Sequence, residues 1–362
     1  MRNLLDLIIA RIPGLNSREK VFLCKEFSRE SDFDGCSWLD IKNKCIDSLS
    51  KPDGSDGENQ MELFSETAKS FSIIPSKTPS KTPQKRRLRN LNASIDIQKC
   101  KAEAYKDALY MQKMGIKYVS IVDDSYPCLL KEIFDPPAVL FYRGDLKGIK
   151  GIQIAIVGTR HAKSESLSLC YKIARGVSEE GFTVVSGLAL GVDAMAHRGC
   201  IDGKSPTIAV LGSSVDCIAP LTNKPLARRI IEGGGAIVSE YPPLTQPTKW
   251  SFPERNRIIS GLCPFTLVIE AGVKSGALIT VDFALSEGRD LGVALDSSGN
   301  PCGEGCKKLA SEGAKQISSA SDILKEFAIS PCPKNDERRK TDEQSKDVKS
   351  DLASSLAAEL GM

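Results

Sequence analysis

Six short apolar runs, each rich in β-branched residues, recur through the second half of the chain. Most are apolar at successive positions, which predicts strands covered on both faces of a sheet. The stretches between the runs show helical spacing. After the first run that spacing extends from Leu167 to Val177, and Gly181 is a typical helix terminator. This alternation predicts an α/β fold with a doubly wound, mostly parallel sheet. The predicted strands are Ile152–Val157, Phe182–Ser186, Thr207–Leu211, Ala236–Ser239, Thr266–Glu270 and Leu291–Leu295.

Residues 1–48 predict a small helical domain in front of this sheet. The apolar residues of Leu4–Ile9 have mixed helical spacing, Pro13-Gly14 ends the helix, and Asn16 or Ser17 can cap a second helix. The outline is that of a helix–hairpin–helix or SAM-like domain. Its hairpin either holds a DNA phosphate on backbone N–H groups or is a plain structural turn.

Composition divides the rest of the chain into three parts. Residues 49–100 are rich in Ser, Lys, Pro, Asp and Gly, which predicts a disordered basic linker. Residues 101–327 contain a predicted helix, Ala102–Met114, then a turn and short strand within 136–144, and then the α/β alternation. Residues 328–362 mix Lys, Asp, Glu and Ser and predict a disordered tail.

Charge becomes informative when it is counted by segment. The chain has 49 Lys and Arg against 46 Asp and Glu, a net charge of +3. Residues 77–113 hold ten basic and three acidic residues, 10 − 3 = +7, whereas residues 151–326 hold 18 of each and are neutral. A DNA site on the folded part must therefore be a focused pocket. The basic linker either adds nonspecific DNA affinity or is only solvated.

Several classes of protein are excluded by composition. No run of 18 apolar residues exists, so no membrane span is predicted. The N-terminus lacks the order of a signal peptide, and the twelve cysteines are scattered, which favours reduced thiols in a cytoplasmic protein. With only two histidines, a His-rich metal site is excluded.

The loops that follow the predicted strands carry the candidate chemistry, because ligands of doubly wound sheets bind at the carboxyl ends of the strands. Gly158-Thr159-Arg160-His161 suits an anion, with a structural turn as the alternative. In the next loop Gly187 and Gly191 allow close backbone approach. Asp193 is a candidate helix cap, and His197 is interpreted as structural or ligand-positioning, since no nucleophile or metal accompanies it.

The stretch Lys249–Arg257 combines three cations, two aromatic rings and an amide within nine positions. Cations hold phosphates, and an aromatic ring stacks on an unpaired base. Arg255 and Arg257 are hard to bury without partners, so one of them is a candidate for a structural ion pair with a glutamate. Lys274-Ser275-Gly276 forms a further glycine-rich turn suited to an anion. Ser275 as a nucleophile would need a base.

These motifs, in this order, resemble the DNA-processing protein A (DprA, Smf) family over about residues 110–327. The resemblance implies an extended Rossmann fold that binds single-stranded DNA without catalysis, forms a homodimer, and protects single strands and loads the RecA recombinase in natural transformation or DNA recombination. By position, Arg160 matches the family's DNA-contacting arginine, and Lys249 and Phe252 match residues that line the same pocket. The motifs are Ala155–Arg160, Ser186–Ala189, Ser239–Pro243, Phe252–Ile259 and Ser275–Thr280.

Some positions depart from the family pattern. Leu190 stands where an arginine is common, which removes one phosphate contact, and Ala219-Pro220 replaces the usual Tyr-Pro. The C-terminal winged-helix domain of many relatives is expected to be absent. The alternative hypothesis is a nucleotide-processing enzyme of the lysine-decarboxylase-like phosphoribohydrolase type with Glu270 as the acid, although its Pro-Gly-Gly loop is missing. A third possibility is a protein-interaction scaffold.

The sequence thus predicts a DNA-binding site with no catalytic residue, no metal and no cofactor. The expected partners are single-stranded DNA, RecA and a second copy of the chain. The predicted DNA-binding residues are Gly158, Thr159, Arg160, Gly187, Lys249, Phe252, Arg255, Asn256, Arg257, Lys274, Ser275 and Gly276.

Overall fold

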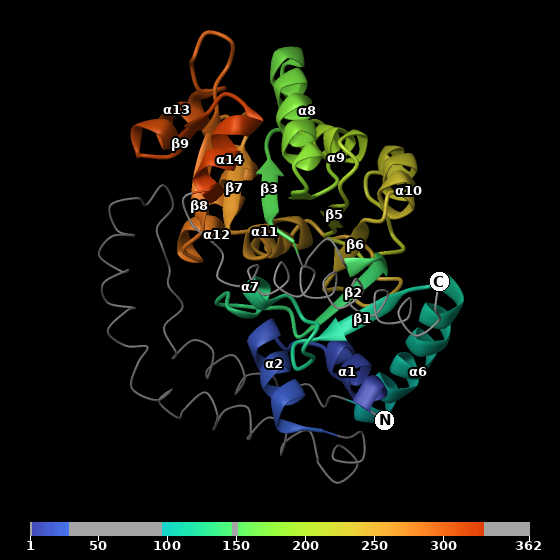
Figure 1. Ribbon diagram of the computed structural model, residues 1–362. Helices are drawn as coiled ribbons and strands as arrows, with labels where there is room; N and C mark the ends of the chain where they lie inside the picture. The colour runs from blue at the N-terminus through green and yellow to red at the C-terminus, as the bar shows by residue number, and fades with distance from the viewer. Residues whose placement is uncertain (1, 29–95, 147–150, 329–362) are drawn as a thin grey trace, which may run out of the picture. The chain divides into compact units, whose positions relative to one another are not determined.

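The computed structural model describes residues 2–28, 96–146 and 151–328 (Figure 1). The chain divides into a compact unit of residues 1–320 and a second unit of residues 321–362. Most of the predicted linker and of the predicted C-terminal tail lies outside the described residues, so those predictions remain open. The last described helix, α14 (Ala320–Ala328), falls mainly in the second unit.

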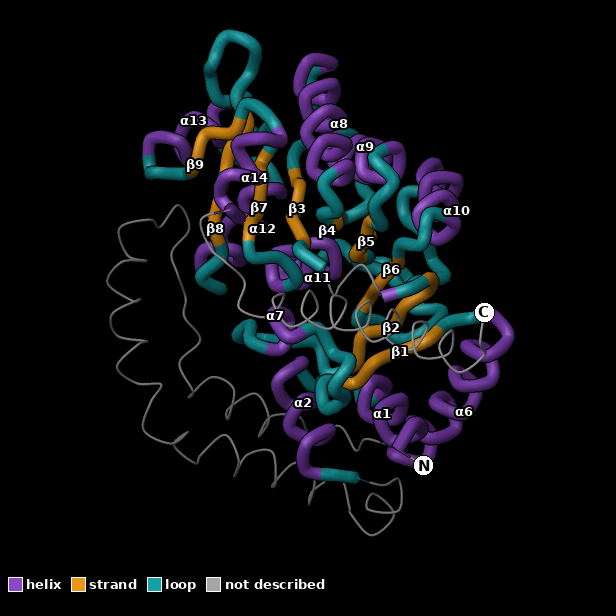
Figure 2. Tube along the Cα trace, viewed as in Figure 1, coloured by secondary structure: helices purple, strands orange, loops and turns teal. Residues whose placement is uncertain are grey.

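A nine-stranded sheet in the order β1-β2-β6-β5-β4-β3-β7-β8-β9 organises the described part of the chain (Figure 2). The strands from β6 to β9 in that order are all parallel, and β1 and β2 add an antiparallel edge. The strands are β1 (Lys117–Ser120), β2 (Val139–Gly144), β3 (Gln153–Val157), β4 (Thr183–Ser186), β5 (Thr207–Val210), β6 (Ala236–Ser239), β7 (Phe265–Val268), β8 (Asp290–Ala294) and β9 (Lys315–Ile317).

The sheet is doubly wound. From β3 the chain steps outward to β6, then crosses back to β7 and steps outward in the other direction. Since parallel crossovers are right-handed, the helices of the two directions cover opposite faces. One set is α8 (Ser164–Glu179), α9 (Val192–Asp202) and α10 (Lys224–Glu232). The other set is α11 (Ser251–Gly261), α12 (Ala277–Ser286) and α13 (Glu304–Ser311).

The predicted α/β fold is confirmed, and each of the six predicted strands is present within one or two residues. The short strand predicted within 136–144 is β2. The helix predicted from Ala102 is α6 (Ile97–Met114); it begins five residues earlier, and Gly115 ends it in the left-handed region at φ 63°. Strands β1 and β9 were not predicted. Both are short edge strands with exposed polar positions, so they lack the apolar runs of the central strands.

The N-terminal helices follow the predicted outline, with α1 (Arg2–Arg11), a turn at Pro13-Gly14, and α2 (Ser17–Glu26). Asn16 is the N-cap of α2 and forms a capping box with Glu19: its side chain accepts from the Glu19 N–H, and the Glu19 carboxylate accepts from the Asn16 N–H. Buried side chains of both helices belong to the same apolar core as β1, β2 and the parallel strands. The boundaries of a separate N-terminal domain remain a prediction.

The contact between α8 and α9 gives a stability prediction. A methyl group on Gly199 of α9 would lie 2.6 Å from the Tyr171 carbonyl oxygen and 3.0 Å from the Ala174 Cβ of α8. Gly→Ala usually stabilises a helix interior by about 1 kcal/mol. At Gly199 the added methyl group would overpack the contact between α8 and α9, so the change in stability should have the opposite sign. We expect Gly199→Ala to lower the free energy of unfolding, measured by urea denaturation, by about 1–3 kcal/mol. Gly151→Ala is the matched control, because nothing lies within 4 Å of its new methyl group.

Candidate nucleic-acid interface

A cleft of about 720 Å³ opens beyond the carboxyl ends of β3 and β7. These adjacent strands are where the winding of the sheet reverses, which is the usual ligand position in doubly wound folds. The loops after the two strands are tied together: the Thr159 N–H donates to the Glu270 carbonyl at 2.9 Å, and the Ile269 N–H donates to the Val157 carbonyl at 3.0 Å. The first turns of α11 and α12 complete the walls.

Three of the residues that line the cleft are exposed cations, Arg160, Lys249 and Lys274. Within the described residues, no carboxylate forms an ion pair with any of them. The Arg160 guanidinium lies 5.9 Å from the centroid of the Phe252 ring, so cation and ring face the same space. A methyl group on Gly212 would lie 3.1 Å from the Phe252 ring, so the ring is backed by the chain beyond β5. The cleft therefore offers positive charge beside a supported aromatic ring.

Glycine lets the backbone come together around the cleft at two positions. Gly191 has φ +74°, and a Cβ there would lie 2.5 Å from the Arg160 carbonyl oxygen. A Cβ on Gly158 would lie 2.6 Å from a methyl carbon of Val192. The loop that carries Arg160 is thus held directly against the start of α9, and its shape is fixed by packing.

Ser275 and Gly276 lie where α12 begins at the cleft. The Ala277 N–H donates to the Ser275 hydroxyl at 3.3 Å, and the Asn256 side-chain amide donates to the Gly276 carbonyl at 3.5 Å. Asn256 therefore joins the walls formed by α11 and by the α12 loop. The start of a helix favours negative charge, so this end of the cleft suits a phosphate.

Arg255 lies beneath the cleft and is 5% exposed. Its guanidinium donates to the Gly187 carbonyl at 2.8 Å and to the Val210 carbonyl, and its Nε donates to the Asn256 side chain at 3.2 Å. Burial lowers the pKa of Arg255 to about 10 although nearby Asp193 raises it, and burial raises the pKa of Asp193 against the pull of Arg255. Arg255 therefore ties the floor of the cleft together, with most of its donors already used.

Gly187 is buried behind this arginine and does not line the cleft. A Cβ on Gly187 would lie 2.5 Å from an Arg255 nitrogen and 2.7 Å from an Asp193 carboxylate oxygen. The absence of a side chain thus makes room for the two buried side chains. The predicted close approach at this glycine is made by protein side chains.

Arg257 points away from the cleft. Its side chain is buried, donates to the Glu240 carboxylate at 2.6 Å and to the Ser17 hydroxyl at 3.0 Å, and lies 3.4 Å from the Asp135 carboxylate. Burial lowers the pKa of Arg257, but Glu240 and Asp135 raise it more, and the net shift is upward. The sequence offers either Arg255 or Arg257 for a structural ion pair with a glutamate, and it is Arg257 that forms one.

The structure brings ten of the twelve predicted residues into one cleft, all except Gly187 and Arg257. His161, Asp193 and Thr280 also line the cleft, although they are not among the twelve predicted residues. The signal for His161 is its place directly after Arg160 in the same turn. Asp193 was expected to cap α9, but Gly191 is the N-cap, and the Asp193 carboxylate accepts the Ala189 N–H at 3.3 Å.

His197 has a structural role, one of the two that the sequence favours over a catalytic one. It is fully buried, and its Nδ1 lies 2.8 Å from the Thr207 hydroxyl oxygen. Burial lowers its pKa to about 3, so the ring is neutral at neutral pH. The Glu270 carboxylate accepts the Lys163 N–H at 3.0 Å at the start of α8. Among the described residues no cluster of three or more His, Cys, Asp or Glu side chains could hold a metal ion.

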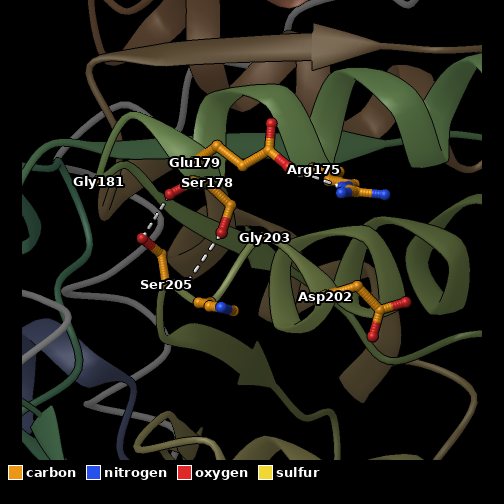
Figure 3. A pocket seen from close by; sticks show the side chains of 8 residues that line it. Arg175, Ser178, Glu179, Gly181, Asp202, Gly203 and Ser205 are labelled. Carbon is orange, nitrogen blue, oxygen red and sulfur yellow. Dashed lines mark hydrogen bonds and ion pairs between the residues drawn. The ribbon is translucent and has the colours of Figure 1, made fainter.

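A second hollow, of about 460 Å³, lies where α8 and α9 end (Figure 3). Several of its polar groups bond to one another: the Ser205 N–H donates to the Ser178 hydroxyl at 2.9 Å, the Ser205 hydroxyl donates to the Ser178 carbonyl at 2.7 Å, and Arg175 pairs with Glu179 within α8 at 2.8 Å. The two bonds of Ser205 join the end of α8 to the chain that follows α9. The cations that line the hollow, Arg175 and Lys204, are matched in number by the carboxylates of Glu179 and Asp202, and no aromatic ring of a described residue lines it.

No helix among the described residues is long and apolar enough to cross a membrane.

Fold and cleft together define a Rossmann-like α/β protein with a cationic, aromatic cleft at the switch point of its sheet. The chain belongs to the DNA recombination-mediator protein A family, whose model matches residues 117–328. It is 42% identical over 208 residues to the DNA processing protein DprA of Streptococcus pneumoniae, covering 58% of this chain and 73% of that protein. It is 41% identical over 217 residues to the DprA of Bacillus subtilis, covering 60% and 73%.

Two solved structures share the fold. The X-ray structure of DprA from Streptococcus pneumoniae matches with a TM-score of 0.57 and 34% identity, covering 74% of this chain and 92% of that chain. A structure of DprA from Helicobacter pylori, titled for its single-stranded DNA binding mode, matches with a TM-score of 0.52 and 28% identity, covering 59% and 96%.

The buried guanidinium under the cleft gives a second stability prediction. Arg255→Leu leaves the buried Gly187 and Val210 carbonyl groups without their donor and removes the positive charge that favours the ionised form of the buried Asp193 carboxylate, so it should lower the free energy of unfolding by about 3–5 kcal/mol. Urea denaturation followed by circular dichroism measures the change. Arg160→Ala, which removes an exposed cation from the same cleft, should change the free energy by less than about 0.5 kcal/mol. Equal stability of the two variants would contradict the assignment of Arg255 to the floor of the cleft.

His197 gives a prediction for pH dependence. Its folded pKa of about 3 is below the unfolded value of about 6.5, so in acid the unfolded chain binds the extra proton first. Stability from this group is therefore full above the unfolded pKa and falls as the pH drops below it, by about 2 kcal/mol between pH 7 and pH 5. Urea unfolding at both pH values should show a smaller difference for His197→Asn. An unchanged difference would contradict the neutral, buried ring.

Proposed function

We propose that the chain binds single-stranded DNA in the cleft between the loops that follow β3 and β7. The observation that supports this proposal most directly is the Arg160 guanidinium 5.9 Å from the centroid of the Phe252 ring, with no ion pair between Arg160 and a carboxylate of residues 2–28, 96–146 or 151–328. A basic groove with an aromatic stacking platform binds single strands with little preference for sequence. The ring adds a reason to favour single strands, because its face can stack only on a base that is not already stacked within a duplex.

The charge distribution supports a focused site. Residues 151–326 carry 18 basic and 18 acidic residues, yet three cations that line the cleft form no ion pair with any carboxylate in the described part of the chain. The same balance argues against binding over a broad basic surface. Family membership and the single-stranded DNA binding of DprA from Helicobacter pylori support the same ligand class.

We extend the proposal to the wider role of such a mediator. The chain would protect single strands, assemble as a homodimer and load RecA during DNA recombination or natural transformation, acting in the cytoplasm as a binding protein. The family description as a recombination mediator supports the recombination role. The nine described cysteines are all free, as suits a reducing compartment. Light scattering tests the dimer, and RecA filament formation on protein-coated single strands tests loading.

The alternative of a phosphoribohydrolase makes a distinct prediction. Incubation with nucleoside monophosphates would release free base, which chromatography detects. We expect none, because the Pro-Gly-Gly loop that holds the phosphate in such enzymes is missing from this chain. Release of base that is lost in Glu270→Gln would replace the present proposal.

Arg160→Ala tests the cleft directly. We expect it to weaken binding of oligo-dT about tenfold, the value of one charge-assisted contact to a phosphate. Each phosphate contact also contributes about −0.7 to the slope of log K against log salt, so the slope should become shallower by about that amount. Gel shifts or fluorescence anisotropy at several salt concentrations provide both numbers.

The matched control is Arg198→Ala, since Arg198 is an exposed arginine on α9 that does not line the cleft. It should leave both affinity and salt slope unchanged. Wild-type protein should also prefer oligo-dT to a duplex of the same length. If Arg160→Ala and Arg198→Ala behave alike, the cleft is not the binding site.

A further inference from the structure

Trp250 is a large aromatic residue that the fold leaves 66% exposed at the edge of the cleft. It is the N-cap residue of α11 and precedes Phe252 by two positions, but it is not among the residues that line the cleft. A single exposed apolar side chain is ordinary in itself. Trp250 differs from such residues because hydrogen bonds hold the backbone on both sides of it and because its neighbour Lys249 lines the cleft.

The backbone on both sides of Trp250 is held firmly by hydrogen bonds. The Thr248 N–H donates to the Ser251 hydroxyl at 3.0 Å, the Ser251 N–H donates to the Thr248 hydroxyl at 3.2 Å, and the Ser251 hydroxyl donates to the Thr248 carbonyl at 2.9 Å. The Trp250 carbonyl accepts the Glu254 N–H at 3.1 Å. The turn that carries the indole is therefore already ordered, so stacking on the ring does not also have to order the backbone.

Lys249 connects the indole to the cleft. Its ammonium lies 5.0 Å from the centroid of the Trp250 ring, and the same side chain lines the cleft. A phosphate held by Lys249 would therefore be beside Trp250, and the nucleotide that follows would leave the cleft at the indole. Since two thirds of the residue is exposed, ring surface remains open to a base.

We propose that Trp250 is a second stacking platform, which binds an unpaired base of the single strand immediately outside the cleft. The inference rests on the proposed function and extends it, because it gives the strand a direction of exit past Lys249. The cleft, with Arg160 and Phe252, holds one part of the strand. Trp250 adds contact only with strands long enough to reach beyond it.

The test compares two lengths of oligo-dT, about 4 and about 16 nucleotides, which span common site sizes of single-strand binding domains. Loss of one stacked base costs about tenfold in affinity. We expect Trp250→Ala to weaken binding of the longer strand by that factor and to leave the shorter strand unchanged. Trp250→Phe should restore most of the loss because it keeps a π-face, and Trp250→Leu should not.

The matched control is Phe134→Ala. Phe134 is also an exposed aromatic residue, at 55%, with the Arg18 guanidinium 4.4 Å from its ring centroid, but it does not line the cleft. It should bind both lengths like the wild type. A Trp250→Ala variant that loses nothing on the longer strand, or loses equally on both, overturns the proposal.

Fluorescence gives an independent readout. The chain has two tryptophans, so Trp38→Phe leaves Trp250 as the sole reporter. The longer strand should quench its emission at saturation and the shorter strand should not; absence of quenching by the longer strand overturns the stacking. If wild-type protein binds neither strand, the proposed function itself fails. If Arg160→Ala abolishes binding but Trp250→Ala does not change it, the proposed function stands and only the second stacking platform is ruled out.

Discussion

The buried guanidinium of Arg255 is the interaction on which the cleft depends. It reaches from α11 to the carbonyl groups at the ends of β4 and β5, and its charge acts on the buried Asp193 carboxylate at the start of α9. Losing this guanidinium would be costly, because two buried carbonyl groups would lack their donor and Asp193 would lose the positive charge that offsets its burial. The arrangement therefore holds the loops at the carboxyl ends of the strands in one geometry and leaves Arg160 free to meet a ligand.

Three consecutive residues of α11 have three different roles for a geometric reason. Successive side chains on a helix point about 100° apart. Arg255 consequently points under the cleft, Asn256 points into it, and Arg257 points to Glu240 and the N-terminal helix α2. The same short motif supports the site, lines it and attaches the N-terminal helices to the sheet. Only the contacts of each side chain in the folded structure separate these roles, since all three residues are polar and adjacent in the sequence.

The cleft itself shows how a chain with a net charge of +3 can offer a strong local positive field. Arg160, Lys249 and Lys274 come from three loops far apart in the sequence and meet at one edge of the sheet. Carboxylates of the described residues pair with other cations, such as Glu240 with Arg257. Residues 151–326 can therefore have no net charge and still present an excess of positive charge inside the cleft.

The sequence by itself determined the elements. Apolar runs predict the central strands because both faces of a parallel strand are buried, and the strand-end loops locate the site because ligands of such sheets bind there. Edge strands β1 and β9 have no such pattern, so the sequence does not predict them. Only the tertiary structure decided which polar residues face solvent. The sequence shows the same side chain for Arg160, which is exposed in the cleft, and for Arg255, which is buried beneath it. The role of each arginine is determined by its burial and by the groups that other elements place around it.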